Sequence, residues 1–456
     1  MNIPTTAQAA KIIADASGGT VAHIERQLRW RPTWFADVEV DGETVGMVLR
    51  GDRTDSAAFP LRHEYTFHRL MEQQGLPVPH LCAFVETPGF LDAVLMAKVP
   101  GKPDFAGVSD VDRDRVVDEY VQQLAVLHQL DPQPFIDAGI SHPGPGEDAA
   151  AIGHRHMVSR YRERKVRPDP FSEFCIGWHF RHLPQANGRL APCVWDSGQF
   201  MHDNGHLVAI IDLEFGHVGD PLEDLTIWRM RDTLLHFGDF AKIYARYEQF
   251  TGRPIDLEAI KRHHFAACMG NGLQFGAAWR DPLPDTDVMN IMQWSSETNL
   301  MATDFLGEYL GLDLPRLEAP PSLASRHDTV SQQLVRSLSS VKVDDREAQH
   351  DMRLAFRMAR HLQRRSEIGT ALDDADIAEV AKLLDRRPQD WHSAERELEQ
   401  FVLDDAAVGR YDEPLTVLFH KRNQRLHMAL GPPGSSMVRH YECQRFDGGP
   451  SLIVQF

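Results

Sequence analysis

The chain has 456 residues, of which 42% are apolar and 25% are charged, as in an ordinary globular protein with room for two or three domains. Its formal net charge of −18 argues against nucleic acid or an anionic membrane as the main partner. The five cysteines show no paired spacing, no apolar run reaches the length of a membrane span, and the N-terminus lacks a secretory signal, so we expect a cytoplasmic protein without a zinc site.

The first fifty residues are expected to form one helix and an antiparallel sheet. Thr6–Ala16 has the pattern of a polar helix that ends before a Gly-Gly pair. Alternating polar and apolar residues predict strands at Val21–Trp30, Thr33–Val40 and Thr44–Arg50. Asp41-Gly42 is a strong hairpin signal, so the last two strands should be antiparallel neighbours.

Helical patterns become more frequent further along the chain. Leu61–Gln74 has helical periodicity, whereas Val94–Val99 has the pattern of a strand that Pro100-Gly101 ends. An apolar stripe predicts a long amphipathic helix over 112–130, and Leu207–Ile211 is a short apolar run typical of a buried strand. Further helices are predicted at Leu225–Leu235, Phe240–Thr251, Leu257–Gly272 and Asp287–Gly311.

The last third of the chain is predicted to be mainly helical. Leu312–Ser325, with prolines at 315, 320 and 321, is the best candidate for a linker. Helices are predicted beyond it at Val330–Leu338, Glu347–Arg365, Ile368–Leu384 and Ser393–Leu403. The tail alternates more like strands, at Thr416–His420, Leu426–Leu430 and Ser451–Gln455. It contains no catalytic motif.

The stretch Cys193–Asp224 contains the residues best suited to chemistry. The apolar run at 207–211 leads directly into two acids, Asp212 and Glu214. A third acid, Asp196, lies in a turn-forming Asp-Ser-Gly that Gln199 follows. Two acids held by a hairpin, with an amide beside the first, suit a site that activates a hydroxyl and holds Mg²⁺, which prefers oxygen ligands. The alternative is a hairpin with solvated acids at its ends.

The same stretch resembles the aminoglycoside phosphotransferase and choline kinase family, relatives of the protein kinases. Ile211-Asp-Leu-Glu214 followed by Gly219-Asp-Pro-Leu-Glu-Asp-Leu225 is similar to that family's metal-binding strand end and the segment after it. The resemblance implies an α+β, bilobal, protein-kinase-like fold with an additional, mainly helical C-terminal region. The expected parts are a small nucleotide-binding lobe (1–99), a large catalytic lobe (100–311), the linker (312–325) and a mainly helical domain of unknown role (326–456).

The resemblance also implies roles for the acids. Asp212 would chelate Mg²⁺ on the phosphates of ATP, Asp196 would accept the proton of the acceptor hydroxyl, and Gln199 would replace the Asn that helps to hold the metal. Glu214 would assist the metal or the acceptor, or orient the loop. Asp224 is expected to hydrogen-bond and cap within the large lobe.

Four further positions would bind the nucleotide. Arg50 matches the phosphate-binding basic residue, and Glu64 matches the helix acid that pairs with it. The hairpin tip that would cover the phosphates has no glycine, so either Arg29 or Arg31 is a candidate to grip phosphate, the alternative being that both solvate the loop. The last of the four positions is the hinge, where the backbone groups of Ala97 and Val99 would pair with adenine.

One departure bears on the activity. The family's loop usually reads His-Gly-Asp, four residues, then Asn, whereas only Ser197 and Gly198 separate Asp196 from Gln199, so the loop is two residues short. The predicted function is ATP-dependent phosphorylation of a hydroxyl on a small molecule, with a metabolic alcohol or hydroxyacyl-CoA as the preferred acceptor. An aminoglycoside-type resistance kinase and a catalytically inactive kinase-like binding module stay open as alternatives. A homodimer through the C-terminal region is a further expectation, with neither nucleic acid nor membrane as partner.

Overall fold

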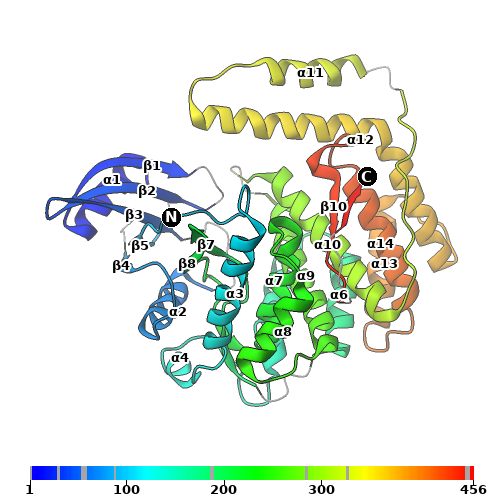
Figure 1. Ribbon diagram of the computed structural model, residues 1–456. Coiled ribbons are helices and arrows are strands. Elements are labelled where there is room, and N and C mark those ends of the chain that lie inside the picture. The colour runs from blue at the N-terminus through cyan, green and yellow to red at the C-terminus, as the bar shows by residue number, and fades with distance from the viewer. Residues whose placement is uncertain are drawn as a thin grey trace. The chain divides into compact units, whose positions relative to one another are not determined.

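A computed structural model describes residues 3–27, 31–52, 59–86, 89–184, 189–282, 286–324, 328–446 and 452–456. The contacts group the chain into two compact units, each assembled from separate stretches of sequence (Figure 1). We call Met1–Gly153, Gln185–Ile260 and Gln444–Pro450 the sheet unit, and His154–Pro184, Lys261–Cys443 and Ser451–Phe456 the helical unit. The domain boundaries predicted at 99, 311 and 325 stay a prediction.

The sheet unit contains the strands and helices on which the predicted site residues lie. Its N-terminal elements are α1 (Thr6–Ser17), β1 (Thr20–Gln27), β2 (Thr33–Val40), β3 (Glu43–Gly51), α2 (Leu61–Gln73), β4 (Leu81–Val85) and β5 (Ala93–Ala97). Its later elements are α3 (Asp110–Leu127), α4 (Gln133–Asp137), η1 (Ala149–Ala151), β6 (Ala191–Cys193), β7 (Phe200–Asp203), β8 (His206–Ile210), β9 (His217–Gly219), α7 (Leu222–Leu235) and α8 (Phe240–Thr251).

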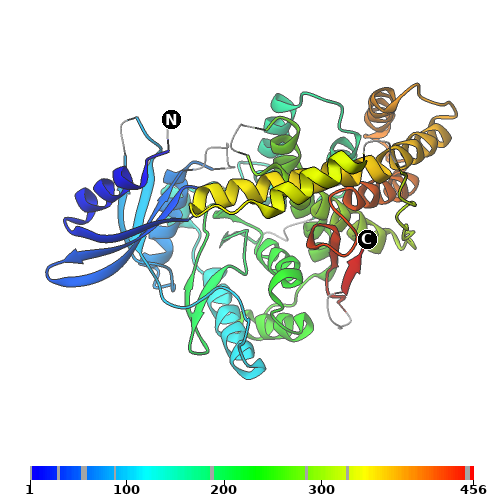
Figure 2. The same cartoon turned by 90° about the horizontal axis from the view of Figure 1, so that it is seen from above.

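An antiparallel sheet of five strands, in the order β1-β2-β3-β5-β4, forms the N-terminal lobe of this unit. Val40 pairs with Glu43 across the two-residue turn Asp41-Gly42, and both turn residues have positive φ (49° and 83°), as the hairpin prediction requires. Helix α1 lies across one face of the sheet (Figure 2), because Ala9 and Ile13 are buried in the cluster that contains the alternate β2 residues Trp34 and Val38.

The second lobe of the sheet unit is mainly helical and has a large aromatic core. Two short antiparallel ladders, β6 with β9 and β7 with β8, lie beside α3. Tyr120 of α3, Phe200 of β7 and Trp228 of α7 are buried together in this core. Removing such large side chains from water is the main stabilising term for a lobe of this kind. The α+β class and the antiparallel-sheet lobe followed by helices are therefore confirmed.

The helical unit contains the mainly helical C-terminal region that was predicted. Its elements are α5 (His154–Arg164), α6 (Pro170–Arg181), most of α9 (Leu257–Arg280), α10 (Val288–Leu310), α11 (Asp328–Ser340), α12 (Arg346–Leu384), α13 (Trp391–Asp405), α14 (Asp412–Met428), η2 (Ser436–Val438), β10 (Arg439–Glu442) and β11 (Leu452–Gln455). Helix α10 packs against α14, α6 packs against α13, and α11 packs along α12. None of the helices in the described part of the chain is both long and apolar enough to cross a membrane.

Two predictions for the C-terminal region were wrong. The strand expected at Thr416–His420 lies within α14, and the one expected at Leu426–Leu430 covers the last three residues of that helix and the two that follow it. Acids at the start of that helix (Asp412 and Glu413) and basic residues at its end favour a helix through the helix dipole, and this signal outweighs a short alternating pattern. The helices expected at Glu347–Arg365 and Ile368–Leu384 form one continuous helix, α12.

Candidate active site

The loop between β6 and β7 holds Asp196 in a constrained position. Trp195, directly before it, has a φ of 60°, a left-handed conformation that costs energy for any residue other than glycine. The backbone N–H groups of Val194 and Trp195 donate to Asp224 Oδ2 (2.9 Å) and Oδ1 (2.7 Å). Asp224 is fully buried at the start of α7 and also lies 3.0 Å from His128 Nε2. The start of α7 therefore fixes the backbone of this loop, and Asp224 hydrogen-bonds as predicted.

The carboxylate of Asp196 has one donor on each oxygen. Gln199 Nε2 donates to Oδ2 at 2.7 Å, and the guanidinium of Arg231, from α7, donates to Oδ1. Burial raises the pKa of Asp196 above its usual range, although Arg231 acts in the opposite direction. The side chain is still 22% exposed, so it is accessible to a small molecule.

Asp212 lies next to this loop, just beyond β8. The N–H of Ile211 donates to the carbonyl oxygen of Gln199 at 3.0 Å, which ties the two acid-bearing segments together. Asp212 has a φ of 63° and forms an ion pair with Arg50 of β3. Burial opposes ionisation of Asp212, but Arg50 and Arg31 outweigh it and hold its pKa well below the usual range. Asp212 is thus ionised at neutral pH, as a Mg²⁺ ligand has to be.

Two arginines and three carboxylates form one buried network around Arg50. Arg50 Nη1 lies 3.0 Å from Glu64 Oε1, so the ion pair expected between this strand and α2 is present. Arg31 donates to Glu64 Oε2 at 2.7 Å and to Glu214 Oε2 at 2.5 Å, and its Nε donates to the carbonyl oxygen of Gly51 at 3.0 Å. Burial opposes the charge of Arg50, but Asp212 and Glu64 outweigh it and raise its pKa. The network has one carboxylate in excess, which favours a cation.

The other predicted nucleotide-binding positions are placed less directly. Arg29 lies outside the described residues. Arg31 is buried, with both of its terminal nitrogens bound to carboxylates, and a phosphate contact by it stays a prediction. Ala97 ends β5, and its N–H donates to the carbonyl oxygen of His80 at 2.8 Å, while Val99 is half-buried just beyond the strand. Their contact with adenine also stays a prediction.

The oxygen donors fit a Mg²⁺ ion at Asp212 better than one at Glu214. The Asp212 side chain is 28% exposed, whereas that of Glu214 is 7% exposed and is held by Arg31. Gln199 is tied to the Asp212 segment through its backbone carbonyl oxygen, and its side-chain nitrogen donates to Asp196, while its amide oxygen as a metal ligand stays a prediction. Among the described residues, one other group of ligand-type side chains converges, His128, Cys193 and Asp224, but Asp224 already accepts two backbone hydrogen bonds and that of His128.

Sequence reasoning missed Arg231 and the carboxylate partners of Arg31. Arg231 lies 35 residues after Asp196, on a helix where an arginine is an ordinary surface residue, so no local pattern marks it. The buried position of Arg31 depends on how the first hairpin packs, which strand periodicity does not reveal.

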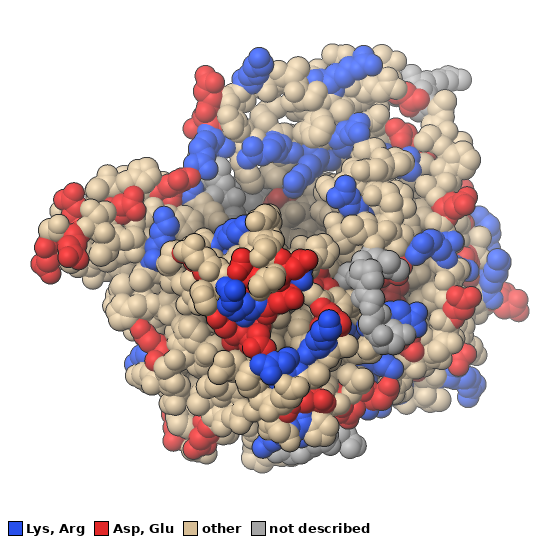
Figure 3. All heavy atoms as spheres, in the orientation of Figure 1, with Lys and Arg blue, Asp and Glu red and all other residues tan. Residues whose placement is uncertain are grey.

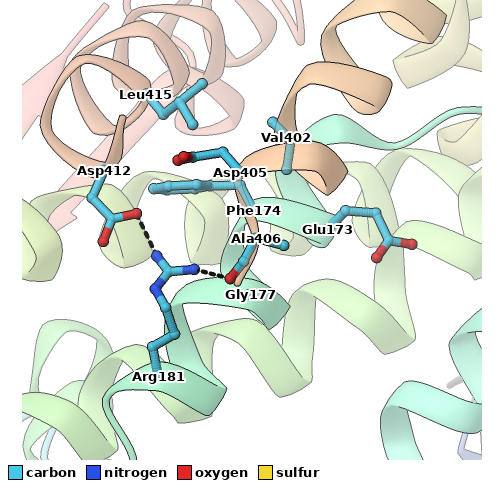
Figure 4. A pocket seen from close by; sticks show the side chains of 9 residues that line it. All are labelled: Glu173, Phe174, Gly177, Arg181, Val402, Asp405, Ala406, Asp412 and Leu415. Carbon is cyan, nitrogen blue, oxygen red and sulfur yellow. Dashed lines mark hydrogen bonds and ion pairs between the residues drawn. The ribbon is translucent and has the colours of Figure 1, made fainter. Parts of the chain in front are cut away.

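A small pocket in the helical unit offers no second site of this kind. It is lined by Glu173, Phe174, Gly177, Arg181, Val402, Asp405, Ala406, Asp412 and Leu415 (Figure 4). Arg181 crosses it, donating to Asp412 and to the carbonyl oxygen of Ala406. Glu173 pairs with Arg162 and Lys165, and Asp405 accepts from the N–H groups of Arg410 and Tyr411, so each charged group of the lining already has a partner.

Comparison with known proteins agrees with the resemblance. The phosphotransferase enzyme family model matches residues 31–261, just over half of the chain. No curated protein matches this chain. Similar solved structures include the macrolide 2′-phosphotransferase MphH from Brachybacterium faecium (18% identity, TM-score 0.41, 59% of this chain and 92% of that one). An ethanolamine kinase from Plasmodium vivax has 11% identity and a TM-score of 0.43, over 61% of this chain and 82% of that one. The spectinomycin phosphotransferase APH(9)-Ia has 10% identity and a TM-score of 0.44, over 65% of this chain and 95% of that one.

The family match includes Arg31, Arg50, Glu64 and the whole stretch from Asp196 to Asp224. The ion-paired network and the acid-bearing loop described above thus lie inside the matched residues. The chain belongs to the phosphotransferase enzyme family, which confirms its predicted kinship with the aminoglycoside phosphotransferases and choline kinases.

Proposed function

We propose that this protein transfers the γ-phosphoryl group of MgATP to a hydroxyl group of a small molecule. The observation that carries the proposal is the convergence of Asp196 and Asp212, on segments joined by the hydrogen bond from Ile211 to Gln199. One acid is held by an amide and a guanidinium, and the other is an ionised carboxylate beside a phosphate-type arginine. Phosphoryl transfer requires a group that orients the acceptor hydroxyl and a charged site for the phosphates.

Each residue of the site has a separate task in this proposal. Asp196 accepts the proton of the acceptor hydroxyl, whose oxygen forms the new bond to phosphorus as the bond to ADP breaks. Arg50, held by Glu64, exchanges its bond to Asp212 for the phosphates. Mg²⁺, held by Asp212 and Gln199, would neutralise charge on the phosphates. Catalysis at such a site is mostly positioning and charge stabilisation.

The remaining predicted residues support the same site. Glu214 and Arg31 orient Glu64 and the segment after β8 through their buried ion pairs. Ala97 and Val99 supply backbone groups to the adenine, and Arg29 lies on the hairpin proposed to cover the phosphates. We propose a metabolic alcohol or a hydroxyacyl thioester as acceptor, on the resemblance of 211–225 alone, and a cytoplasmic location.

The replacement Asp196→Asn tests this proposal. The variant keeps the shape of the side chain but not the base, so kcat for acceptor phosphorylation should fall by about 10²–10⁴-fold, with little change in ATP affinity. Steady-state kinetics on a panel of alcohols, hydroxyacyl thioesters and aminoglycosides measure it, with Asp203→Asn, an acid on the neighbouring strand, as control. A native protein that binds MgATP but phosphorylates no acceptor would instead be a binding module.

A further inference from the structure

The short loop cannot by itself hold both oxygens of Asp196. Of the residues between Asp196 and β7, Gly198 has no side chain and the hydroxyl of Ser197 donates to the carbonyl oxygen of Asp224. Gln199 is left as the loop's donor, and it binds Oδ2. With one oxygen held, the carboxylate would be free to rotate about its Cβ–Cγ bond, which misaligns a general base.

Arg231 of α7 supplies the second donor. Its Nε donates to the carbonyl oxygen of Ser197 at 3.1 Å, while its terminal nitrogen donates to Asp196 Oδ1. One rigid guanidinium therefore joins the loop backbone and the carboxylate, a geometry that the single nitrogen of lysine does not reproduce. Arg231 follows Asp224 by seven residues, so both project from the same side of the helix.

The loop is shaped to admit this arginine. A Cβ atom at Gly198 would lie 2.5 Å from Trp228 Cδ1 and 3.2 Å from Arg231 Cδ, closer than side-chain atoms normally approach. The φ of Gly198 is 80°, which also favours glycine. The absence of a side chain at Gly198 thus leaves room for the ring of Trp228 and for the stem of Arg231 beside it.

The helix that carries Arg231 is itself fixed. Gln444 Nε2 donates to Asp232 Oδ2 at 3.0 Å, and the N–H of Phe240 donates to Gln444 Oε1 at 2.9 Å. Arg229, which is 1% exposed, donates to the carbonyl oxygen of Gln444. Bonds on both sides of Arg231 hold α7, so the guanidinium has a rigid support.

We propose that Arg231 is a positioning residue that locks the Asp196 carboxylate in the orientation for taking the acceptor's proton, in place of the residues the short loop lacks. This rests on the proposed function of the site. Arg231 acts through Asp196 and not on the nucleotide. Its loss should therefore lower kcat while leaving KM for MgATP unchanged.

The test compares Arg231→Met, Arg231→Lys and Arg246→Met in the full-length chain, with MgATP as substrate and water as the acceptor. Arg231→Met should reduce kcat for ATP hydrolysis by about 10–100-fold with KM within about twofold of the native value. Arg231→Lys, which keeps the charge and the packing of the stem, should have a kcat between those of Arg231→Met and the native protein. Arg246, half-exposed on α8 and paired with Asp118, provides an arginine-to-methionine control with native kinetics.

A double-mutant cycle with Asp196→Asn separates positioning from a general structural effect. Once the base is absent, adding Arg231→Met should cost less than about twofold more, because the two residues act as one unit. Equal losses in both backgrounds, or native kcat in Arg231→Met, would overturn the proposal for Arg231. Native kcat in Asp196→Asn alone would overturn the proposed function instead, so the two failures are distinguishable. If Arg231→Met does not fold, the lysine variant and its own cycle with Asp196→Asn decide the matter.

Discussion

Asp212 and Glu214 are two residues apart, yet their surroundings give them different tasks. Asp212 is 28% exposed and ion-pairs with Arg50, which also binds Glu64. Glu214 is 7% exposed and accepts a hydrogen bond from the equally buried Arg31. A partly exposed ionised acid can exchange its partner for a metal ion more easily than a fully buried one, whose ion pair is costly to break. We therefore propose that Asp212 binds the metal ion and that Glu214 has a structural role.

A pair of matched variants tests this division. Asp212→Asn removes the charge needed for Mg²⁺, so the Mg²⁺-dependent part of ATP binding should disappear, with a smaller loss of unfolding free energy than in the Glu214 variant, because Asp212 is the more exposed of the two acids. Glu214→Gln leaves Arg31 with one fewer charged partner in a buried site, and should cost about 3 kcal/mol of stability. Titration calorimetry with and without Mg²⁺, and urea unfolding, measure the two effects. Equal Mg²⁺-ATP affinity in Asp212→Asn and the native protein would remove the basis for this metal site.

The site residues that could be predicted from the sequence are those with a marked local context. Asp212 follows an apolar strand, whereas the ion pair of Arg50 with Glu64 was implied by the family resemblance, on a helix that periodicity placed within one residue. Arg231 has no such context, because its role depends on the way α7 packs under the loop. Residues whose function arises from tertiary packing stay invisible to local patterns.

At the scale of elements, prediction succeeded where one signal dominated. Helix α2 and the β2–β3 hairpin have clear periodicity and, for the hairpin, the Asp41-Gly42 turn. It failed at 416–420 and 426–430, where a short alternation was interpreted as strands although α14 continues to Met428. Leu415, Leu418 and Phe419 are buried in that helix at a spacing of three to four residues, a pattern that only a longer window shows.

Strand β10 is attached to helix α10 by a charged histidine. His440 Nδ1 lies 3.1 Å from Glu297 Oε1 and its Nε2 lies 2.7 Å from Asp304 Oδ2, so both ring nitrogens donate to carboxylates. Two histidines of α14 also face these acids: His427 lies 3.9 Å from Glu297, and His420 lies 3.5 Å from Asp304. Burial opposes protonation of His440, but the two carboxylates outweigh it and raise its pKa to about 10.

This attachment should weaken at alkaline pH. Because the pKa in the folded state lies above the ordinary value of 6.5, the stabilisation is fully present below 6.5 and is lost as the pH rises through about 10. The difference in unfolding free energy between the native protein and His440→Gln should therefore shrink between about pH 7 and pH 10. Urea unfolding at several pH values measures it, with the exposed His392→Gln as control. A difference that stays constant over this range would contradict the charged clamp.

At the scale of the whole molecule, the net charge hides a segregation of charge along the chain. Acidic side chains gather over α3, and lysines and arginines gather along α12 (Figure 3). The first half of α12 is strongly basic within a chain whose net charge is −18. The net charge therefore describes the long-range field of the protein but not each of its surfaces.

The order of the chain does not follow its compact units. Helix α6, which lies before the predicted catalytic loop in sequence, belongs to the helical unit together with α13 and α14. Arg181 of α6 donates to Asp412, and the N–H of Asp169, the N-cap of α6, donates to Glu399 of α13 at 2.5 Å. Gln444 lies beyond the helical unit's main segment but belongs to the sheet unit. Boundaries predicted from the sequence divide the chain into consecutive domains, so they do not show that a later segment belongs to an earlier unit.

Because later segments of the chain pack on earlier ones in this way, we predict that the chain cannot be cut within the proline-rich segment 312–325 without loss of folding. A protein ending at Ala324 would lose α13 and α14, which pack on α6, leaving Phe174, now 3% exposed and in ring contact with Phe419, without much of its cover. It would also lose Gln444, which satisfies Asp232 and the N–H of Phe240 beneath the helix that carries Arg231. Exposed apolar surface and buried unpaired polar groups both favour aggregation over folding.

The full-length variant Gln444→Ala isolates the second of these effects. It leaves Asp232, Phe240 N–H and the carbonyl oxygen of Gly238 without their shared partner, so the free energy of unfolding should fall by about 2–4 kcal/mol while the chain still folds. Urea unfolding measures that loss, and size-exclusion chromatography of the truncated protein shows whether it is a monomer or an aggregate. A soluble monomer ending at Ala324 that unfolds cooperatively would show that the C-terminal third is an independent domain. A Gln444→Ala variant of native stability would show that the α7 support does not depend on the tail.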